Sequence, residues 1–277
     1  MKICTFNVNS IKARKDLIVN WLKHRENDLD ILCFQELKTV DQDFPYQDFE
    51  NMGFSCDVAG QKGYNGVAIC SKFPQRRVLK DAIEKHWDEQ KRVIAVKVKG
   101  IDLINVYAPH GDMRGTDKFQ YKLDWYKKLC AFLQQHYSAR DYLMVMGDFN
   151  VALQDRDVWS PEILADSIGT MPEERQAFRE LMEWGLVDAF RHLYPDKRQF
   201  TWWDYIGGAI WKDLGMRIDY ALCTRPLIEK LENVEVDLWP RRRRKPTPSD
   251  HAPLTAAFAP FSEEKGRKTN RRFIPQR

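Results

Sequence analysis

Side chains that can ligate a metal or move a proton recur in this sequence where short apolar runs end. The run at residues 143–146 (LMVM) is too short for a helix and leads to Asp148 and Asn150. Alternation along a strand places these two polar side chains on the same side. Alone, such a pair would also suit an ordinary strand-to-turn junction. The pattern recurs, however, at other predicted strand ends, which supply Asn7, Glu36, Tyr107, Asp219, Asp250 and His251.

These residue types favour one kind of chemistry. Several carboxylates with amide oxygens suit Mg²⁺ or Mn²⁺, and the sequence has no Cys/His cluster with zinc-site spacing. An amide, a phenol and an imidazole beside the metal can hold a phosphate group and stabilise charge on it. Metal-assisted hydrolysis of a phosphodiester needs these parts: a Lewis acid, an activated water, and hydrogen-bond donors to the pentacovalent phosphate.

The elements that must position these side chains alternate between strands and helices. Apolar runs predict strands that end at the polar residues, at residues 3–8, 29–34, 143–147, 217–223 and 252–258. Two hairpins are predicted, one around the glycine-rich turn that presents Tyr64 and one around Lys99-Gly100. Helices are predicted at residues 118–137 and after Pro172. This order predicts an α/β fold in which two packed mixed sheets are flanked by helices.

Composition is typical of a single globular domain. The 277 residues are 43% hydrophobic and 12% aromatic, enough for a substantial core. The six cysteines are scattered without a CxxC motif, so we expect reduced core thiols in a cytoplasmic protein. No apolar stretch approaches membrane-spanning length, and Met1 leads directly into a strand pattern, so neither a membrane partner nor a signal peptide is expected.

The charge is unevenly distributed along the chain. The net charge is +4, yet the region from Arg241 onward is strongly basic and the rest is slightly acidic. This asymmetry indicates a polyanionic partner approached from one side. The run at residues 241–244 is by default a solvated loop, although its place just before Ser249 also favours contact with nucleic acid. We expect one domain at residues 1–261 and a disordered basic tail at residues 262–277.

Six short motifs occur in a characteristic order: NVN, QELK, NVYAP, GDFN, RIDY and SDHAPL. Together they resemble the endonuclease/exonuclease/phosphatase superfamily, and within it the exonuclease III family of abasic-site DNA repair nucleases. The match runs from Met1 to about Phe258. The resemblance implies a four-layered sandwich of two mixed β-sheets flanked by helices. It also implies a monomeric enzyme that uses Mg²⁺, or Mn²⁺, to cut double-stranded DNA 5′ to abasic sites and to trim 3′ ends.

The resemblance also assigns roles to individual residues. Glu36 would be the main metal carboxylate, in a metal set that comprises Asn7, Glu36, Asp148, Asn150, Asp250 and His251. Asp148 would align or deprotonate the attacking water, and Asn150 would bind the scissile phosphate. His251, oriented by Asp219, would donate to a phosphate oxygen, with Tyr107 against the phosphate or the leaving oxygen. Which of Asp148, His251 and Tyr107 moves the proton stays open. The implied DNA-binding residues are Gly63, Tyr64, Arg92, Trp202, Met216, Arg241 and Arg242.

Simpler interpretations stand beside some of these assignments. Asp219 can instead pair with Arg217, Tyr107 can present its hydroxyl to solvent, and Trp202 can be a core residue. The sequence also departs from the family pattern at the rim of the expected site, where it has His110, Ile206 and Met216. Two rival functions remain: a phosphatase acting on inositol phosphate or sphingomyelin, and a DNA-binding relative without catalysis.

Overall fold

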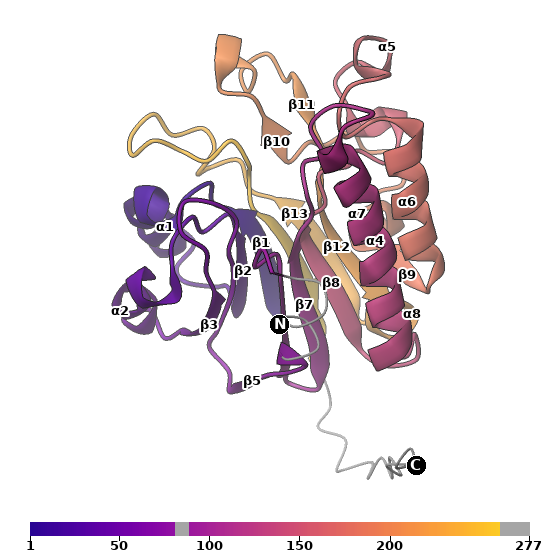
Figure 1. Cartoon of the computed structure of the whole chain (residues 1–277). Helices are drawn as coiled ribbons and strands as arrows, with labels where there is room; N and C mark the ends of the chain where they lie inside the picture. Colours follow the sequence, from indigo (N-terminus) through magenta and orange to yellow (C-terminus); the bar gives the residue numbers. More distant parts are fainter. Residues whose placement is uncertain (81–88, 261–277) are drawn as a thin grey trace, which may run out of the picture.

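Two six-stranded β-sheets form the centre of the protein, as Figure 1 shows for the computed structural model, which describes residues 1–80 and 89–260. The first sheet has the strand order β13-β14-β1-β2-β4-β3. Only β1 and β2 run parallel in it. Its strands are β1 (Lys2–Asn7), β2 (Ile31–Gln35), β3 (Ser55–Ala59), β4 (Val67–Ser71), β13 (Leu231–Val236) and β14 (Leu254–Phe258).

The second sheet has the order β5-β6-β7-β8-β12-β9, with β7 and β8 parallel and the other neighbours antiparallel. Its strands are β5 (Gln75–Arg77), β6 (Val93–Val98), β7 (Ile101–Tyr107), β8 (Leu143–Asp148), β9 (Leu186–Asp188) and β12 (Asp219–Thr224). A short ribbon of β10 (Trp202–Trp203) and β11 (Gly215–Met216) lies apart from both sheets. Both predicted hairpins, β3–β4 and β6–β7, are confirmed.

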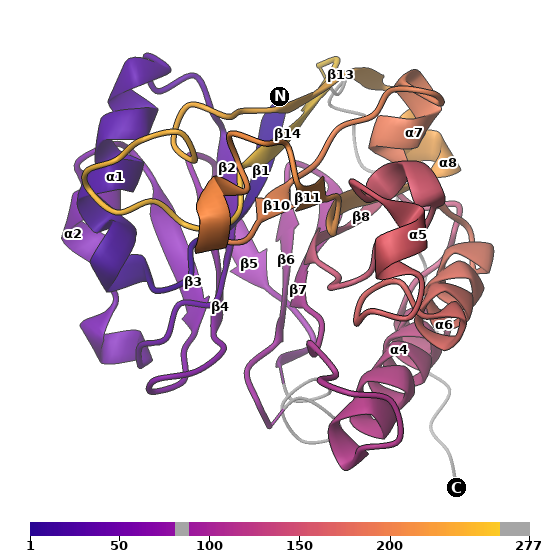
Figure 2. The ribbon, with the colours of Figure 1, turned by 90° about the horizontal axis from the view of Figure 1, so that it is seen from above.

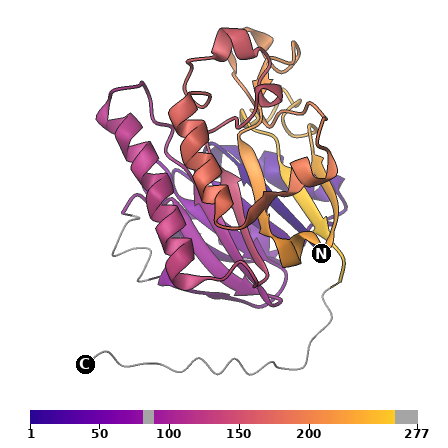
Figure 3. The same ribbon diagram turned by 90° about the vertical axis from the view of Figure 1, so that its right-hand side faces the viewer.

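Helices cover the outer faces of both sheets, which makes four layers (Figures 1 and 2). The first sheet is covered by α1 (Ile11–His24) and α2 (Tyr46–Glu50). The long helices α4 (Asp117–His136) and α6 (Pro172–Glu183) lie side by side over the second sheet, as Figure 3 shows. The described residues also form the short helices α5 (Pro161–Leu164), α7 (Ala189–Leu193), α8 (Arg225–Ile228), η1 (Asp41–Asp43), η2 (Asp155–Asp157) and η3 (Ile206–Gly208). The predicted α/β sandwich is thus confirmed.

The apolar core has one layer between the two sheets and one between each sheet and its helices, and strand alternation determines which residues face each layer. Ile3 of β1 and Met144 and Met146 of β8 are buried in the layer between the two sheets. Asn7 and Asp148 occupy the same face of their strands further along the chain. The two strands therefore deliver an amide and a carboxylate to one end of the space between the sheets.

The cysteines depart from the sequence expectation at one pair. Cys56 and Cys70 form a disulfide, because the register of β3 and β4 places them directly opposite each other, with their Cα atoms 3.9 Å apart. The expectation of reduced thiols is wrong for these two. Cys4, Cys33, Cys130 and Cys223 are free.

Two further expectations from the sequence concern membrane-spanning helices and the C-terminal tail. In the part of the chain that the structure describes, no helix is long and apolar enough to cross a membrane. The expected basic tail at residues 262–277 lies outside the described residues.

Candidate active site

A cavity of about 270 Å³ opens where the two sheets present their polar strand ends. One part of its wall carries carboxylate, amide, phenol and imidazole groups, and another part is apolar. The lining residues are Glu36, Tyr107, His110, Asp148, Asn150, Ile168, Gly169, Trp202, Met216, Ile218, Asp250 and His251. Most of the site residues predicted from the sequence are thus brought together in one place.

Asn7 connects the two sheets at the base of this cavity. Its Nδ2 donates to Glu36 Oε1 at 2.9 Å and to Asp148 Oδ2 at 2.9 Å. Burial raises the pKa of Asp148 above its usual range, and the charge of Asp219 adds to this effect, against the lowering by His251, Asn7 and the Asn150 N–H. Asp148 is therefore a carboxylate whose affinity for a proton is well above that of an exposed aspartate.

His251 is held by carboxylates on both sides of its ring. Its Nδ1 lies 2.9 Å from Asp219 Oδ2, and its Nε2 lies 3.7 Å from Asp148 Oδ2. Burial disfavours the charged ring, but the charges of Asp219 and Asp148 outweigh it and raise the pKa of His251 to about 10. The imidazole is therefore protonated at neutral pH and serves as a hydrogen-bond donor.

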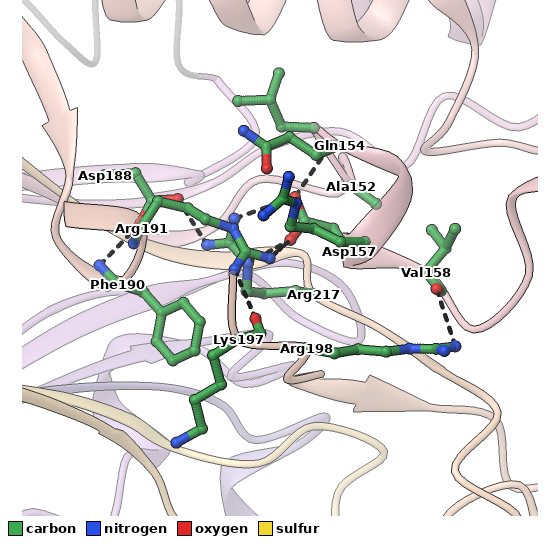
Figure 4. Close-up of polar contacts among 12 residues, drawn as sticks. Ala152, Gln154, Asp157, Val158, Asp188, Phe190, Arg191, Lys197, Arg198 and Arg217 are labelled. Carbon is green, nitrogen blue, oxygen red and sulfur yellow. Dashed lines mark hydrogen bonds and ion pairs between the residues drawn. The ribbon is translucent and has the colours of Figure 1, made fainter. Parts of the chain in front are cut away.

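The alternative pairing of Asp219 with Arg217 is wrong. Figure 4 shows Arg217 beside Asp157, Asp188 and Arg191, and its side chain is completely buried. Its Nε and Nη2 donate to the two oxygens of Asp157 at 2.8 and 3.1 Å, and its Nη1 donates to Asp188 Oδ2 at 2.7 Å. Arg191 also pairs with Asp157. Because Arg217 is occupied there, the Asp219 carboxylate stays with His251.

A cluster of acidic groups can accommodate a cation. Ligand atoms of Glu36, Asp148 and His251 lie within 4.8 Å of one another. Burial would raise the pKa of Glu36, but hydrogen bonds from Asn7 and the charge of Lys38 lower it below its usual range. Asp250 is also held ionised, because His251, Trp202 and Asn9 outweigh the effect of burial on its pKa. Ionised carboxylates with an adjacent amide oxygen fit a hard divalent cation.

Two residues to which the sequence analysis gave no role complete this cluster. Lys38 Nζ lies 2.9 Å from Glu36 Oε2 and donates to Asn9 Oδ1 at 2.6 Å. Asn9 Nδ2 in turn donates to Asp250 Oδ1 at 3.0 Å. The chain from Lys38 through Asn9 thus connects the two acidic groups. Both residues lie within the motifs QELK and NVN, which are the only sequence signals that point to them.

Two further polar residues neighbour Asp148: Tyr107 pairs with it across β7 and β8, and Asn150 follows it by two residues. Asn150 has a left-handed backbone (φ 52°), its N–H donates to Asp148 Oδ1 at 2.8 Å, and its Nδ2 donates to Ala108 O at 2.9 Å. Tyr107 is half-buried and lines the cavity. Burial together with the charges of Glu36 and Asp148 raises its pKa well above the usual range, so the phenol stays neutral and can donate.

The apolar wall comes from the β10–β11 ribbon and the segment before α6. Trp202 pairs with Met216 in this ribbon and is only half-buried, whereas its neighbour Trp203 is a core residue with 1% exposure. Trp202 Nε1 donates to Asp250 Oδ2 at 3.0 Å, which ties the wall to the acidic cluster. Gly169 faces Met216, and a Cβ built on it would lie 3.3 Å from Met216 Cε.

A second cavity of about 440 Å³ adjoins the first through His110, which lines both. Arg92 and Lys118 also line it. The Arg92 guanidinium lies 4.8 Å from the centre of the Tyr107 ring, and its Nη1 donates to Tyr107 O at 3.3 Å. Burial and the charge of Lys122 lower the pKa of His110, so its ring is neutral at pH 7.

The remaining residues implied for DNA contact fall into two groups. Tyr64 is 73% exposed next to Gly63, and Arg242 is exposed as well. Arg241, by contrast, is only 5% exposed. Its Nε donates to Asp250 O at 3.1 Å and its Nη2 to Trp203 O at 2.9 Å. The guanidinium of Arg241 thus supports the cavity wall from within, and its contact with DNA stays a prediction.

Comparison with known proteins extends these observations. The sequence profile of the Endonuclease/Exonuclease/phosphatase family matches residues 4–251. The exodeoxyribonuclease III of Haemophilus influenzae is 31% identical over 93% of this chain and 100% of its own length. An AP endonuclease structure from Archaeoglobus fulgidus superposes with a TM-score of 0.88 at 40% identity, covering 93% of this chain and 99% of that one. A 3′ phosphatase from Neisseria bound to a product DNA hairpin has a TM-score of 0.85 at 38% identity, covering 94% and 99%.

Proposed function

Because the chain belongs to the endonuclease/exonuclease/phosphatase family, we propose that it is a Mg²⁺-dependent DNA repair nuclease. It is a phosphodiesterase whose relatives are named exodeoxyribonuclease III and AP endonuclease. In our proposal its substrate is double-stranded DNA, which it cuts 5′ to an abasic site and trims from 3′ ends. In this proposal the enzyme acts as a monomer with a single catalytic domain.

The observation that carries this proposal is the division of the 270 Å³ cavity into an acidic part and an apolar part. A deoxyribose without its base is small and apolar on one side, and it would lie against Trp202, Met216 and Ile218 when it is flipped out of the duplex. Its 5′ phosphate would then lie beside Asp148 and His251. A nucleotide with its base attached needs more room on the apolar side, so shape would favour the abasic site.

The proposed roles follow from charge and hydrogen bonding. Glu36, with Asn7 and Asp250 close by, would hold Mg²⁺, which when bound supplies Lewis-acid stabilisation of the phosphate. Asp148 would orient the attacking water and take its proton, a role that its raised pKa favours. His251 would donate to a phosphate oxygen from Nε2, while Asp219 holds Nδ1.

Donors around the phosphate would complete the site. Asn150 would contact the scissile phosphate through its side-chain amide, and the neutral Tyr107 phenol would donate to the phosphate or to the leaving oxygen. The adjoining cavity with Arg92 and Lys118 would take the neighbouring stretch of the phosphate backbone. Gly63, Tyr64 and Arg242 would contact the duplex further from the site.

One assay tests the function against its rivals. The protein is incubated with a labelled duplex that contains a single abasic site, with Mg²⁺ and with EDTA. We expect incision 5′ to the abasic site in Mg²⁺ alone. Binding without incision would support a non-catalytic relative. Release of phosphate from an inositol phosphate, without DNA cleavage, would support the phosphatase alternative.

A further inference from the structure

A buried ion pair between α4 and α6 lies directly behind the catalytic cavity. Lys122 of α4 and Glu174 of α6 are both completely buried, and their charged groups are in contact. Replacing a buried ion pair by apolar residues of similar volume is often neutral or stabilising. Stabilising the packing of α4 against α6 therefore does not explain why the two helices bury charged residues here. The hydrogen bonds that Lys122 and Glu174 make to main-chain groups explain it.

The Lys122 ammonium forms hydrogen bonds to two chain segments that line the cavity. Besides Glu174 Oε1, it donates to the carbonyl oxygen of Asn150 at 2.7 Å and to that of His110 at 3.0 Å. An ammonium has three N–H donors, and all three are used. The segments that follow β7 and β8 are thereby held to one point. Without the ammonium, two carbonyl oxygens would converge with no donor between them.

The main-chain groups of Asn150 are held from several sides. Asn150 has a left-handed backbone (φ 52°), a conformation that asparagine adopts more readily than most residues other than glycine. Its main-chain N–H donates to Asp148 and one N–H of its side-chain amide donates to Ala108 O, while its own carbonyl oxygen accepts from Lys122. The position of Asn150 relative to Asp148 therefore depends on the lysine.

Glu174 holds a third lining segment through its other oxygen. Oε2 accepts from Gly169 N at 2.7 Å and from Met171 N at 3.1 Å. Gly169 O in turn accepts from Ala152 N at 2.7 Å, which ties this segment to the one that contains Asn150. One ion pair thus connects the backbones of His110, Asn150 and Gly169, all of which line the cavity.

We propose that Lys122 and Glu174 are a positioning pair that aligns the phosphate-binding residue Asn150 with Asp148. Neither side chain lines the cavity, and the pair acts through the main chain of the residues that do. This proposal rests on the proposed nuclease function for its kinetic readout. The ion pair would hold the site in its reactive geometry before substrate binds. Loss of the ion pair should therefore lower kcat more than it weakens substrate binding.

The test compares two truncations on the same helix. Lys122→Met keeps the apolar stem and removes the ammonium. Leu133→Ala removes a fully buried side chain that packs against the second sheet and does not line the cavity. Both variants should lower the melting temperature. At a temperature well below both transitions, Lys122→Met should reduce kcat on the abasic duplex by about 100-fold, the scale of a displacement of roughly 1 Å, with KM nearly unchanged. Leu133→Ala should keep the wild-type kcat.

A readout independent of activity completes the experiment. Hydrogen exchange should become faster at the amides of Asn150 and Gly169 in Lys122→Met and stay unchanged there in Leu133→Ala. If Lys122→Met does not fold, Glu174→Gln serves in its place. Equal kcat values for the two variants, or unchanged exchange at both amides, would overturn the proposal. Inactivity of the wild type on the abasic duplex would instead refute the proposed function, and the exchange experiment would still test the positioning.

Discussion

The cluster around Arg217 gives the sharpest prediction about stability. Arg217 is completely buried, and its guanidinium makes charge-assisted hydrogen bonds to Asp157 and Asp188. Arg217→Met would fill a similar volume and leave both carboxylates without this partner (Figure 4). Asp157 would keep Arg191, and Asp188 would keep the N–H groups of Phe190 and Arg191 at the start of α7. The loss is therefore that of one cation from a network.

The size of the effect follows from burial. Removing one partner of a buried ion pair costs about 3–5 kcal/mol, because the remaining charge is uncompensated. For a domain of this size, 1 kcal/mol corresponds to about 2–4 °C in Tm. Arg217→Met should therefore lower Tm by roughly 10 °C. Adding Asp188→Asn to it should recover part of that loss, since Asp188 is the carboxylate left without a cation.

Thermal and urea unfolding measure this effect, with Lys97→Met as the matched control. Lys97 pairs with Asp102 at 2.9 Å, but its side chain is 45% exposed. Losing an exposed pair costs less than about 1 kcal/mol. Equally small losses of stability in Arg217→Met and Lys97→Met would refute the reasoning. They would show that burial of the Arg217 cluster does not increase its contribution to the free energy of unfolding.

Three further predictions concern the metal, the loss of stability at acid pH and the apolar wall of the cavity. Glu36→Gln should raise the Mg²⁺ concentration needed for half-maximal cleavage while leaving DNA affinity largely intact; equal activity at limiting Mg²⁺ would contradict the assignment. Burial would raise the pKa of Asp157, but Arg217 and Arg191 lower it below 3.8, so its contribution to stability is complete above about pH 4 and is lost as the pH falls through the lowered pKa. Asp157→Asn should thus flatten the loss of stability below pH 4 in urea titrations, and an unchanged slope there would argue against it. Trp202→Ala should reduce abasic incision more than 3′-end trimming; a parallel fall of both, with a lowered Tm, would make Trp202 a core residue.

Much of the site was predictable because strand alternation is local. Ile3 and Asn7 lie on one face of β1, and Met144 and Asp148 lie on one face of β8, so the pattern that buries the apolar residues also aims the polar ones. The order of the motifs then indicated that these strand ends meet. The hairpins followed from turn residues for the same local reason.

What the sequence did not reveal depends on contacts between distant segments. Arg241 belongs to a run of four arginines, yet only the packing of the β10–β11 ribbon shows that its guanidinium is used by Trp203 and Asp250 carbonyl groups. The same holds for the disulfide, since no local pattern gives the register of β3 and β4. Lys122 lies three residues after Phe119 and four before Tyr126, on the buried stripe of α4, but its ion-pair partner Glu174 is on a distant segment.

The central claim is that Asp148 takes part in the chemistry and not in holding the DNA. Asp148→Asn keeps the shape of the side chain and removes its ability to accept a proton. Single-turnover cleavage of an abasic duplex in saturating Mg²⁺ should slow by about three orders of magnitude, while the affinity for the same duplex in Ca²⁺ stays near that of the wild type. A loss of cleavage rate of tenfold or less would contradict the account and make Asp148 a structural residue.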